Sequence, residues 1–414
     1  MITCDRLSLV AGLTREARAA GERLPDRISI GVLARTFTDE LVDEVVDAAD
    51  VREVRYRRLP ARLVVLFVLA CWLFMRSGYG LVLSRLADAL AVGGAGWGLW
   101  QLPTTSSITK AKARLGAEPL RLLFDRVKGP QGSMTTPGVF WRDLRVVTMD
   151  GFTLDVPDSP ENAEFFGRGS NGSDSPNPYP QLRAVALAEG GTRALLDAVH
   201  GPYGTGEQTL AADLVGVLEP GMLCLADRNF PSWALWREAA ATGAALLWRM
   251  SASFTLPVLE VLADGTYISE LKPPRRKDGP PIRVRVIEYT VWTTTADGEQ
   301  MSELFCLATT LLDPEGAPAP ELAELYHDRW QAETGIGEMK TTVRGGPEVV
   351  LRSKTPDMVT QEFWAMLCVY QAIRDLIRHA AEPPGLPPAR ISFKHAAEAA
   401  RDWATRAALS PRAT

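Results

Sequence analysis

The chain has 414 residues, 46% hydrophobic and 23% charged, which indicates a globular protein of two or three domains and excludes a disordered chain. Its formal net charge of -5 counts against a protein that coats DNA through overall positive charge, because phosphate binding depends on Lys and Arg. The five cysteines, at positions 4, 71, 224, 306 and 368, form no Cys-x-x-Cys pair, which argues against a zinc site and a disulfide framework.

The longest apolar run, Leu63 to Met75, is shorter than the roughly 18 to 20 residues that a span requires, and Arg62 and Arg76 flank it. The run therefore predicts a buried helix. Asp5 and Arg6 stand where a signal peptide would begin its apolar segment, so no export signal is visible. We expect a cytoplasmic protein with no membrane partner.

Residues 1–138 are predicted to form an N-terminal helical domain. Residues 38–51 place apolar side chains on one face of a helix and acidic ones on the other. Serines at 106 and 107 can cap a later helix rich in cations. A basic cluster is as often a solvated surface as a binding site, whether here, at 52–62 or at 275–277. The cations of the capped helix that we predict to contact DNA are Lys110, Lys112 and Arg114.

From Leu144 the pattern becomes strand-forming. The β-rich run 145–149 ends at Asp150, and two further runs flank a turn at 189–192. An apolar strand is then predicted over 222–226, directly before Asp227, with one helix before it and one after it in the sequence. Another strand follows at 244–248. Because the parallel strands need crossover helices, this order predicts a ribonuclease H-like core.

The chain is therefore predicted to be α/β, with a ribonuclease H-like mixed sheet flanked by helices. Residues 139–250 are the first part of this core, and the alternating pattern of 251–311 predicts a β-rich insertion. The second part, 312–381, contains one long helix from about Pro320 to Met339 and another over 356–381. Residues 382–414 are a proline-rich and weakly helical tail.

The predicted helix after Pro320 carries the strongest chemical motif. Tyr326, Arg329, Glu333 and Lys340 lie at offsets of three, seven and fourteen residues. At about 100° per residue, these positions fall within roughly 60° of one another around a helix. An ion pair between Arg329 and Glu333 on a surface helix would be ordinary. The four together indicate a ligand-binding face, because buried charges without partners are costly.

Two aspartates complete a possible metal site. Asp150 and Asp227 are each predicted at the end of an apolar strand, where an Asp taken alone is more often a turn former. With Glu333 they would make an oxygen-ligand site suited to magnesium or manganese. Two such ions about 3.5 to 4 Å apart can stabilise the attacking and leaving oxygens of a displacement at phosphorus.

Several segments resemble the bacterial DDE transposases of the fourth insertion-sequence family, and the likeness covers most of the chain. They are residues 28–46, 106–124, 147–152, 225–230, the Tyr-Arg-Glu-Lys helix and 351–371. The resemblance implies that Asp150, Asp227 and Glu333 are catalytic and bind two Mg²⁺ or Mn²⁺ ions. It implies that Tyr326, Arg329 and Lys340 hold the phosphates and end bases of the element.

The resemblance also implies cut-and-paste transposition. Water frees a 3′ hydroxyl, which can attack the opposite strand to form a hairpin and later attacks target DNA. The implied partners are the terminal inverted repeats and the target, with a dimer on DNA. We add Arg228, beside Asp227, to the DNA contacts. Trp292 is the candidate for an aromatic residue that holds a flipped base, and Trp248 is the fallback.

Two alternatives stay open. A domesticated or inactive transposase could bind DNA without cutting it, although all three acidic positions are present. A metal-dependent nuclease could hydrolyse DNA without strand transfer, and the three carboxylates alone do not exclude it. The Tyr-Arg-Glu-Lys face favours joining chemistry.

Overall fold

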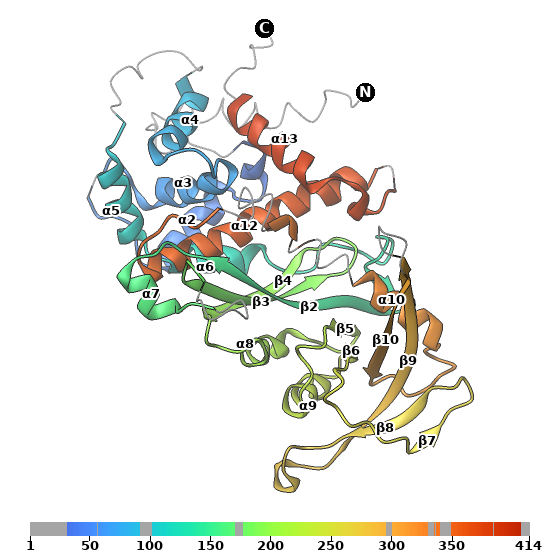
Figure 1. Ribbon diagram of the computed structural model, residues 1–414. Coiled ribbons are helices and arrows are strands. Elements are labelled where there is room, and N and C mark those ends of the chain that lie inside the picture. Colours follow the sequence, from blue (N-terminus) through green and yellow to red (C-terminus); the bar gives the residue numbers. More distant parts are fainter. Residues whose placement is uncertain are drawn as a thin grey trace.

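The computed structural model describes residues 31–55, 57–91, 102–169, 177–294, 300–329, 335, 337–339, 349–383 and 385–406. Figure 1 shows helices at one end of the molecule, a large sheet below them and a β-rich extension at the other end. The α/β class predicted from the sequence is confirmed.

The N-terminal part is helical, as predicted. The longest apolar run forms α3, in which every side chain except that of Arg62 is buried. Its 13 residues form a core helix, and no helix within the described ranges combines the length and hydrophobicity that a bilayer span needs. The elements are η4 (Gly31–Arg35), α2 (Asp39–Ala48), α3 (Ala61–Leu73), α4 (Tyr79–Ala91), α5 (Thr105–Leu115) and α6 (Glu118–Val127).

A single sheet of ten strands follows, in the order β4-β3-β2-β5-β6-β10-β9-β8-β7, with β1 paired to β2 beside this path. Strands β2, β5 and β6 are parallel, and β2, β3 and β4 are antiparallel. This is the ribonuclease H-like arrangement. The bounds are β1 (Phe140–Trp141), β2 (Leu144–Asp155), β3 (Gln181–Glu189), β4 (Leu195–Pro202), β5 (Met222–Ala226) and β6 (Ala245–Arg249).

The predicted β-rich segment extends this sheet and does not form a sheet of its own. Strand β10 pairs antiparallel with β6 of the core, Ala308 facing Trp248, and along its full length with β9. The remaining strands are β7 (Glu260–Val261), β8 (Tyr267–Leu271), β9 (Ile282–Thr294) and β10 (Gln300–Thr309), with the short helix η7 (Arg276–Asp278) between β8 and β9.

Helices cover both faces of the sheet. On one face lie α8 (Glu207–Leu214), η6 (Val215–Val217) and α9 (Trp233–Ala241), which connect β4, β5 and β6. On the other face, α12 (Pro356–Ala381) lies between the sheet and the N-terminal helices (Figure 1). The predicted helix over 356–381 is thus confirmed. The other helices are α7 (Pro160–Phe166), α10 (Ala319–Asp328), η9 (Pro388–Arg390) and α13 (Phe393–Arg406).

The helix predicted from Pro320 to Met339 is described in two stretches. Its first section is α10, which ends at Asp328, and Arg329 keeps a right-handed helical backbone. Gly335 and residues 337–339 are helical. Glu333 and Lys340 lie outside the described residues.

Candidate active site

Asp150 and Asp227 lie side by side at the centre of the sheet. Strands β2 and β5 are parallel neighbours, with Met149 opposite Ala226, so the two aspartates occupy the next position on each strand. Asp227 directly follows β5, as predicted. The prediction that Asp150 ends its strand is wrong, because β2 continues to Asp155 and Asp150 pairs with Ala186 of β3.

Both carboxylates lie on the same face of the sheet. Side chains alternate between faces along a strand, so Asp150 shares a face with Val146, and Asp227 shares one with Leu225. Val146 and Leu225 pack in one apolar cluster with Tyr326 of α10. The aspartates therefore lie on the face that α10 covers.

Each aspartate is held by the amide that follows it. The Gly151 N–H donates to Asp150 Oδ1 at 2.9 Å, and the Arg228 N–H donates to Asp227 Oδ1 at 2.6 Å. Both residues are partly exposed. Such a bond fixes the orientation of a carboxylate.

Tyr326 and Arg329 pack at the end of β5. The Tyr326 hydroxyl donates to the carbonyl oxygen of Ala226 at 3.3 Å, and the Arg329 guanidinium lies 5.5 Å from the centre of the Tyr326 ring. Burial raises the pKa of the Tyr326 phenol, Arg329 lowers it and the charge of Asp227 raises it. The net shift is upward, so the phenol is neutral at pH 7. The predicted common face holds for Tyr326 and Arg329, the two described members of the motif.

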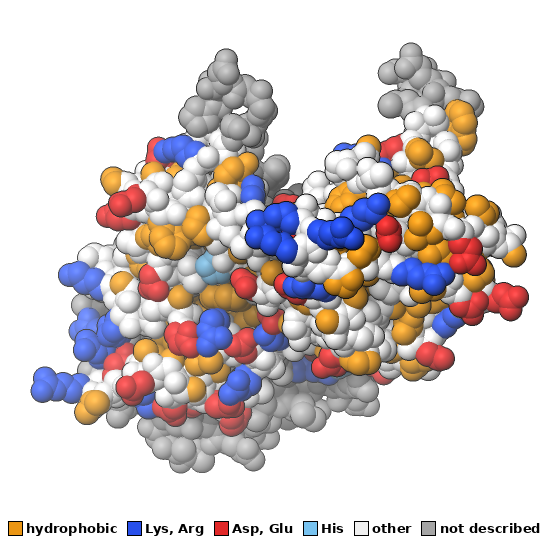
Figure 2. All heavy atoms as spheres, turned by 90° about the horizontal axis from the view of Figure 1, so that it is seen from below, with side chains coloured by type: hydrophobic (Ala, Val, Ile, Leu, Met, Phe, Trp, Pro, Cys, Tyr) orange, Lys and Arg blue, Asp and Glu red, His pale blue; other side chains and the backbone are white. Residues whose placement is uncertain are grey.

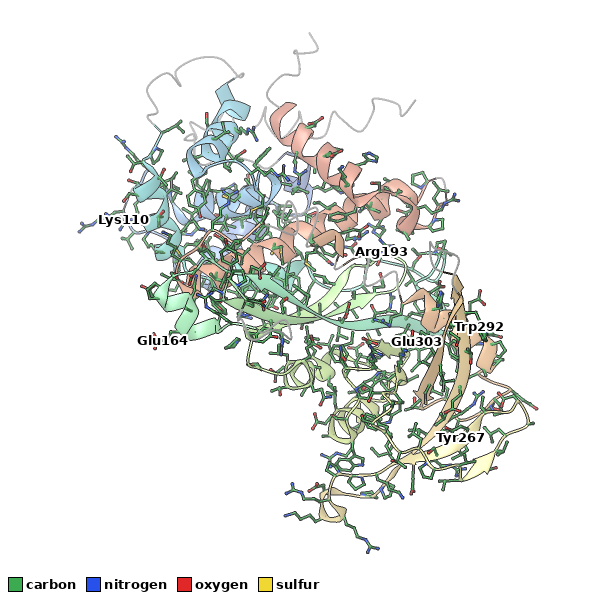
Figure 3. The ribbon with its side chains drawn as sticks, viewed as in Figure 1. Lys110, Glu164, Arg193, Tyr267, Trp292 and Glu303 are labelled. Carbon is green, nitrogen blue, oxygen red and sulfur yellow. The ribbon has the colours of Figure 1, made fainter. Side chains whose placement is uncertain are left out.

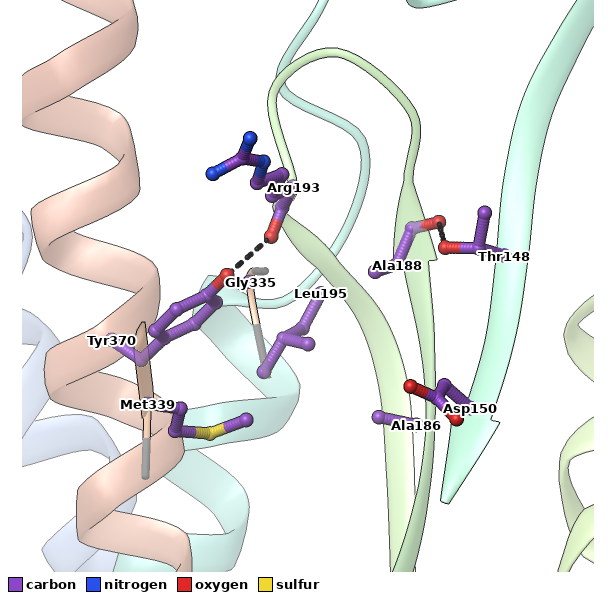
Figure 4. Close-up of a pocket in the computed structure, with 9 residues that line it drawn as sticks. All are labelled: Thr148, Asp150, Ala186, Ala188, Arg193, Leu195, Gly335, Met339 and Tyr370. Atoms are coloured by element: carbon purple, nitrogen blue, oxygen red, sulfur yellow. Dashed lines mark hydrogen bonds between the residues drawn. The ribbon is translucent and has the colours of Figure 1, made fainter. Parts of the chain in front are cut away.

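Asp150 lines a pocket together with residues from between positions 333 and 340 and from α12. Gly335, Met339 and Tyr370 line the same pocket, as Figure 4 shows. A second, larger cleft of about 340 Å³ is lined by Arg329 and shares Thr148 and Arg193 with this pocket. The pocket thus lies between β2 and α12, and the cleft lies between β2 and α10.

The predicted DNA contacts on α5 differ in their surroundings. Lys110 is exposed and points outward in Figure 3. Lys112 is 2% exposed and bonds to Glu362 at 3.0 Å, so its prediction as a DNA contact is wrong. Its partner, about 250 residues away in the sequence, could not be foreseen. Arg114 bonds to Glu53 at 3.1 Å and to the Leu59 carbonyl at 2.7 Å.

The other predicted DNA contacts lie near the β-rich extension. Arg228 is exposed, 3.9 Å from Glu303. Trp292, labelled in Figure 3, lies on β9 and is 69% exposed, whereas Trp248 is completely buried in the core, which removes it as the fallback. The basic cluster at 275–277 is exposed in the loop between β8 and β9, and Figure 2 shows Lys and Arg side chains gathered on the face seen from below.

Arg193, which was not predicted from the sequence, lines both the pocket and the cleft. It follows the turn at 189–192 and has a φ of 60°, a left-handed backbone that is uncommon for residues other than glycine. Its guanidinium bonds to Glu338 at 3.0 Å. Nothing in the local sequence distinguishes it from any other arginine at a turn.

The oxygen donors at this site fit a hard divalent cation. Carboxylates are the ligands that Mg²⁺ and Mn²⁺ prefer, and two are brought together here on adjacent strands. In the part of the chain that the structure describes, no group of three His, Cys, Asp or Glu residues could hold an ion. The third predicted donor, Glu333, is outside that part.

Most of the chain matches known protein families and individual proteins. Residues 27–125 match the family model described as insertion element 4 transposase N-terminal, and residues 141–372 match the transposase DDE domain. The chain is 28% identical to the transposase InsG for insertion sequence element IS4 of Escherichia coli (strain K12), over 86% of this chain and 78% of that protein. It is 31% identical to the putative transposase InsZ of the same organism, over 43% of this chain and 57% of that protein.

Proposed function

Since the chain belongs to the DDE transposases of the insertion element 4 family, we propose that it cuts and joins DNA strands at the terminal inverted repeats of an insertion sequence. The observation that carries this proposal is the placement of Asp150 and Asp227 at equivalent positions of two parallel strands, on the sheet face beneath Tyr326. A phosphodiester laid over that face would meet both carboxylates.

Glu333 is proposed as the third carboxylate. It lies seven residues after Tyr326, which bonds to the strand end before Asp227, and two residues before Gly335, which lines the Asp150 pocket. Tyr326, before Glu333 in the sequence, thus bonds next to Asp227, and Gly335, after Glu333, lines the pocket of Asp150.

We propose that Asp150, Asp227 and Glu333 hold two Mg²⁺ or Mn²⁺ ions per site. When bound, these ions stabilise charge on the attacking and leaving oxygens of the phosphodiester. The chain itself provides orientation. Asp150 and Asp227 are oriented by the backbone N–H groups of Gly151 and Arg228, and the Tyr326 hydroxyl donates to the Ala226 carbonyl at the end of β5. Arg329, Lys340 and Arg228 would bind phosphates.

The reaction proposed has two kinds of step at one site. Water first attacks the phosphodiester at the element end, and the bond to the departing 3′ oxygen breaks, which leaves a 3′ hydroxyl. That hydroxyl then attacks a phosphodiester of the opposite strand or of target DNA, and one bond forms as another breaks. We propose a dimer on double-stranded DNA and a cytoplasmic location, with the protein on the nucleoid when DNA-bound. Lys110 and Arg114 remain proposed DNA contacts.

Trp292 is proposed to stack on a flipped base. Stacking on an aromatic ring is worth roughly 1 to 3 kcal/mol, so Trp292→Ala should lower end cleavage between about 5-fold and 150-fold, and Trp292→Phe much less. The side chain is 69% exposed, so its removal should not affect folding. Leu304→Ala, which removes a 63% exposed side chain from the neighbouring strand β10, is the matched control. Equal cleavage by the Trp292→Ala and Leu304→Ala variants would exclude the stacking role.

The proposed function is tested with the purified chain, Mg²⁺ and linear DNA that carries the element ends. A strand-resolved gel separates nicked, hairpin and joined products. We expect nicking first and joined products later, and no products in the presence of a chelator. End binding without any cleavage would support the domesticated alternative, and cleavage without joining would support the nuclease.

A further inference from the structure

An arginine lies next to the two aspartates in a row that crosses the parallel strands. The register of β5 with β6 places Arg249 beside Asp227, just as the register of β2 with β5 places Asp227 beside Asp150. Arg249 shares a sheet face with Leu247, which belongs to the apolar cluster that packs against α10. Because neighbouring strands are about 4.8 Å apart, the row brings this cation to the edge of the proposed metal site.

One carboxylate, that of Glu303 on β10, holds two arginines of this region. Arg249 forms an ion pair with Glu303 Oε1, and Arg228 lies 3.9 Å from the same oxygen. Figure 3 labels Glu303. Arg228 follows the end of β5 closely and Arg249 is the last residue of β6, so both guanidinium groups converge beyond the carboxyl ends of parallel strands. Open α/β sheets bind their ligands at that edge.

The three side chains of this ion-pair group are held with different firmness. The Arg249 side chain is 14% exposed, and its guanidinium lies 3.9 Å from the centre of the Phe305 ring. Phe305 in turn packs edge-on against Tyr326 of α10, with ring centres 6.4 Å apart. The side chains of Arg228 and Glu303 are 57% and 55% exposed. Since exposed ion pairs contribute little to stability, Glu303 can move away at small cost while Arg249 stays packed.

A DNA phosphate has the chemistry to take the place of the Glu303 carboxylate. Both are anions that present two oxygens, and a guanidinium binds either of them through paired N–H donors. Glu303 also adds a negative charge at the edge of the sheet where phosphates are proposed to bind, and like charges repel. Its carboxylate therefore competes with DNA for the same two cations.

We propose that Arg249 and Arg228 form a phosphate-binding subsite beside Asp227, and that Glu303 occupies this subsite until a DNA phosphate displaces its carboxylate. The inference rests on the proposed function of that site. Arg249 is thus a direct contact to the DNA backbone, and Glu303 is a competitor that lowers the affinity for DNA.

The test measures how the full chain binds a labelled duplex that carries an element end, without metal, so that no strand is cut. We expect Glu303→Gln to bind about two- to fivefold more tightly, the range that corresponds to loss of an exposed ion pair. Arg249→Gln should bind more weakly and reduce the slope of log affinity against log salt by about one, as for the loss of one phosphate contact. Added to Arg249→Gln, the Glu303→Gln change should give little of its gain, because the two residues act through one contact.

Glu260→Gln is the matched control. It removes an exposed carboxylate that pairs with another arginine of the β-rich extension, Arg283 at 3.0 Å, and it should leave end binding unchanged. An equal gain in Glu260→Gln and Glu303→Gln would overturn the proposal, because net charge would then explain the effect. An unchanged salt slope in a folded Arg249→Gln variant would overturn it as well.

Arg249→Lys serves if Arg249→Gln does not fold. It keeps the charge and loses the paired donors, so it should bind the end more weakly than the unchanged chain, and equal binding would contradict the phosphate contact. All of these are binding measurements without metal. The proposed function is judged separately, by strand cleavage with Mg²⁺.

Discussion

Replacing Asp150 or Asp227 with Asn, or Glu333 with Gln, is expected to lower strand cleavage at least about a thousandfold while end binding persists. Each change keeps the shape of the side chain and removes the negative charge that a divalent ion requires. Ions at such a site stabilise the transition state by several kcal/mol, and each 1.36 kcal/mol is a factor of ten in rate. The measurement is a time course of cleavage on a strand-resolved gel, with end binding followed separately.

The control for this series is Asp213→Asn, which changes an exposed carboxylate on α8. It should cleave like the unchanged chain. Cleavage at the normal rate by Glu333→Gln would remove Glu333 from the site. Loss of end binding in the Asp150 and Asp227 variants would mean that these carboxylates hold the sheet together, since Asp150 lies inside β2.

The second large effect is expected on stability. Glu362 of α12 is 5% exposed, and Lys112 Nζ bonds to it at 3.0 Å, Ser353 Oγ at 2.5 Å and the Arg352 N–H at 2.9 Å. Removal of one partner leaves a buried cation uncompensated, so Glu362→Ala should lower the free energy of unfolding by about 3 to 5 kcal/mol. Chemical denaturation measures this. Glu118→Ala, at an exposed pair, should cost less than about 1 kcal/mol.

The stability that Glu362 contributes is expected to decrease at acid pH. Burial raises the pKa of the Glu362 carboxyl, but the charge of Lys112 and the bonds from Ser353 and Arg352 lower it more, so the net shift is downward. The stabilisation is therefore complete above the ordinary pKa of a Glu side chain, and it is lost as the pH falls through the folded value. Glu362→Gln should flatten this acid limb. An unchanged acid limb in that variant would contradict the assignment.

Local patterns in the sequence were sufficient to predict the centre of the sheet. The apolar run over 222–226 and the β-rich run that reaches Asp150 are strands in the structure, and their parallel pairing follows from the crossover helices. The length of β2 beyond Asp150 was missed because an Asp after an apolar run is more often a turn former, whereas β3 pairs with β2 as far as Asp155. Pairing between strands far apart in the chain overrides such a local signal.

Partners distant in the sequence account for the other differences. Lys112 has the same local pattern as the exposed Lys110, and only Glu362, far along the chain, makes one a buried ion pair. Arg193 and Glu338 also have no distinctive local pattern, and only the fold brings Arg193 and Arg374 of α12 to the same Glu338 carboxylate. The exposure of Trp292 likewise depends on β10, which pairs with β9 and leaves that side chain uncovered. Periodicity within a segment carries no information on such contacts.

Helix α12 couples the unfolding of the N-terminal helices to that of the sheet. Its buried side chains belong to one apolar cluster that also includes α3, Phe152 of β2 and Phe393 of α13. A chain cut at residue 138 would leave Phe363 and its neighbours uncovered, so each fragment would expose a hydrophobic surface and tend to aggregate. Heating should accordingly produce one melting transition that spans both ends of the protein, even though the two family models divide it into an N-terminal and a catalytic part.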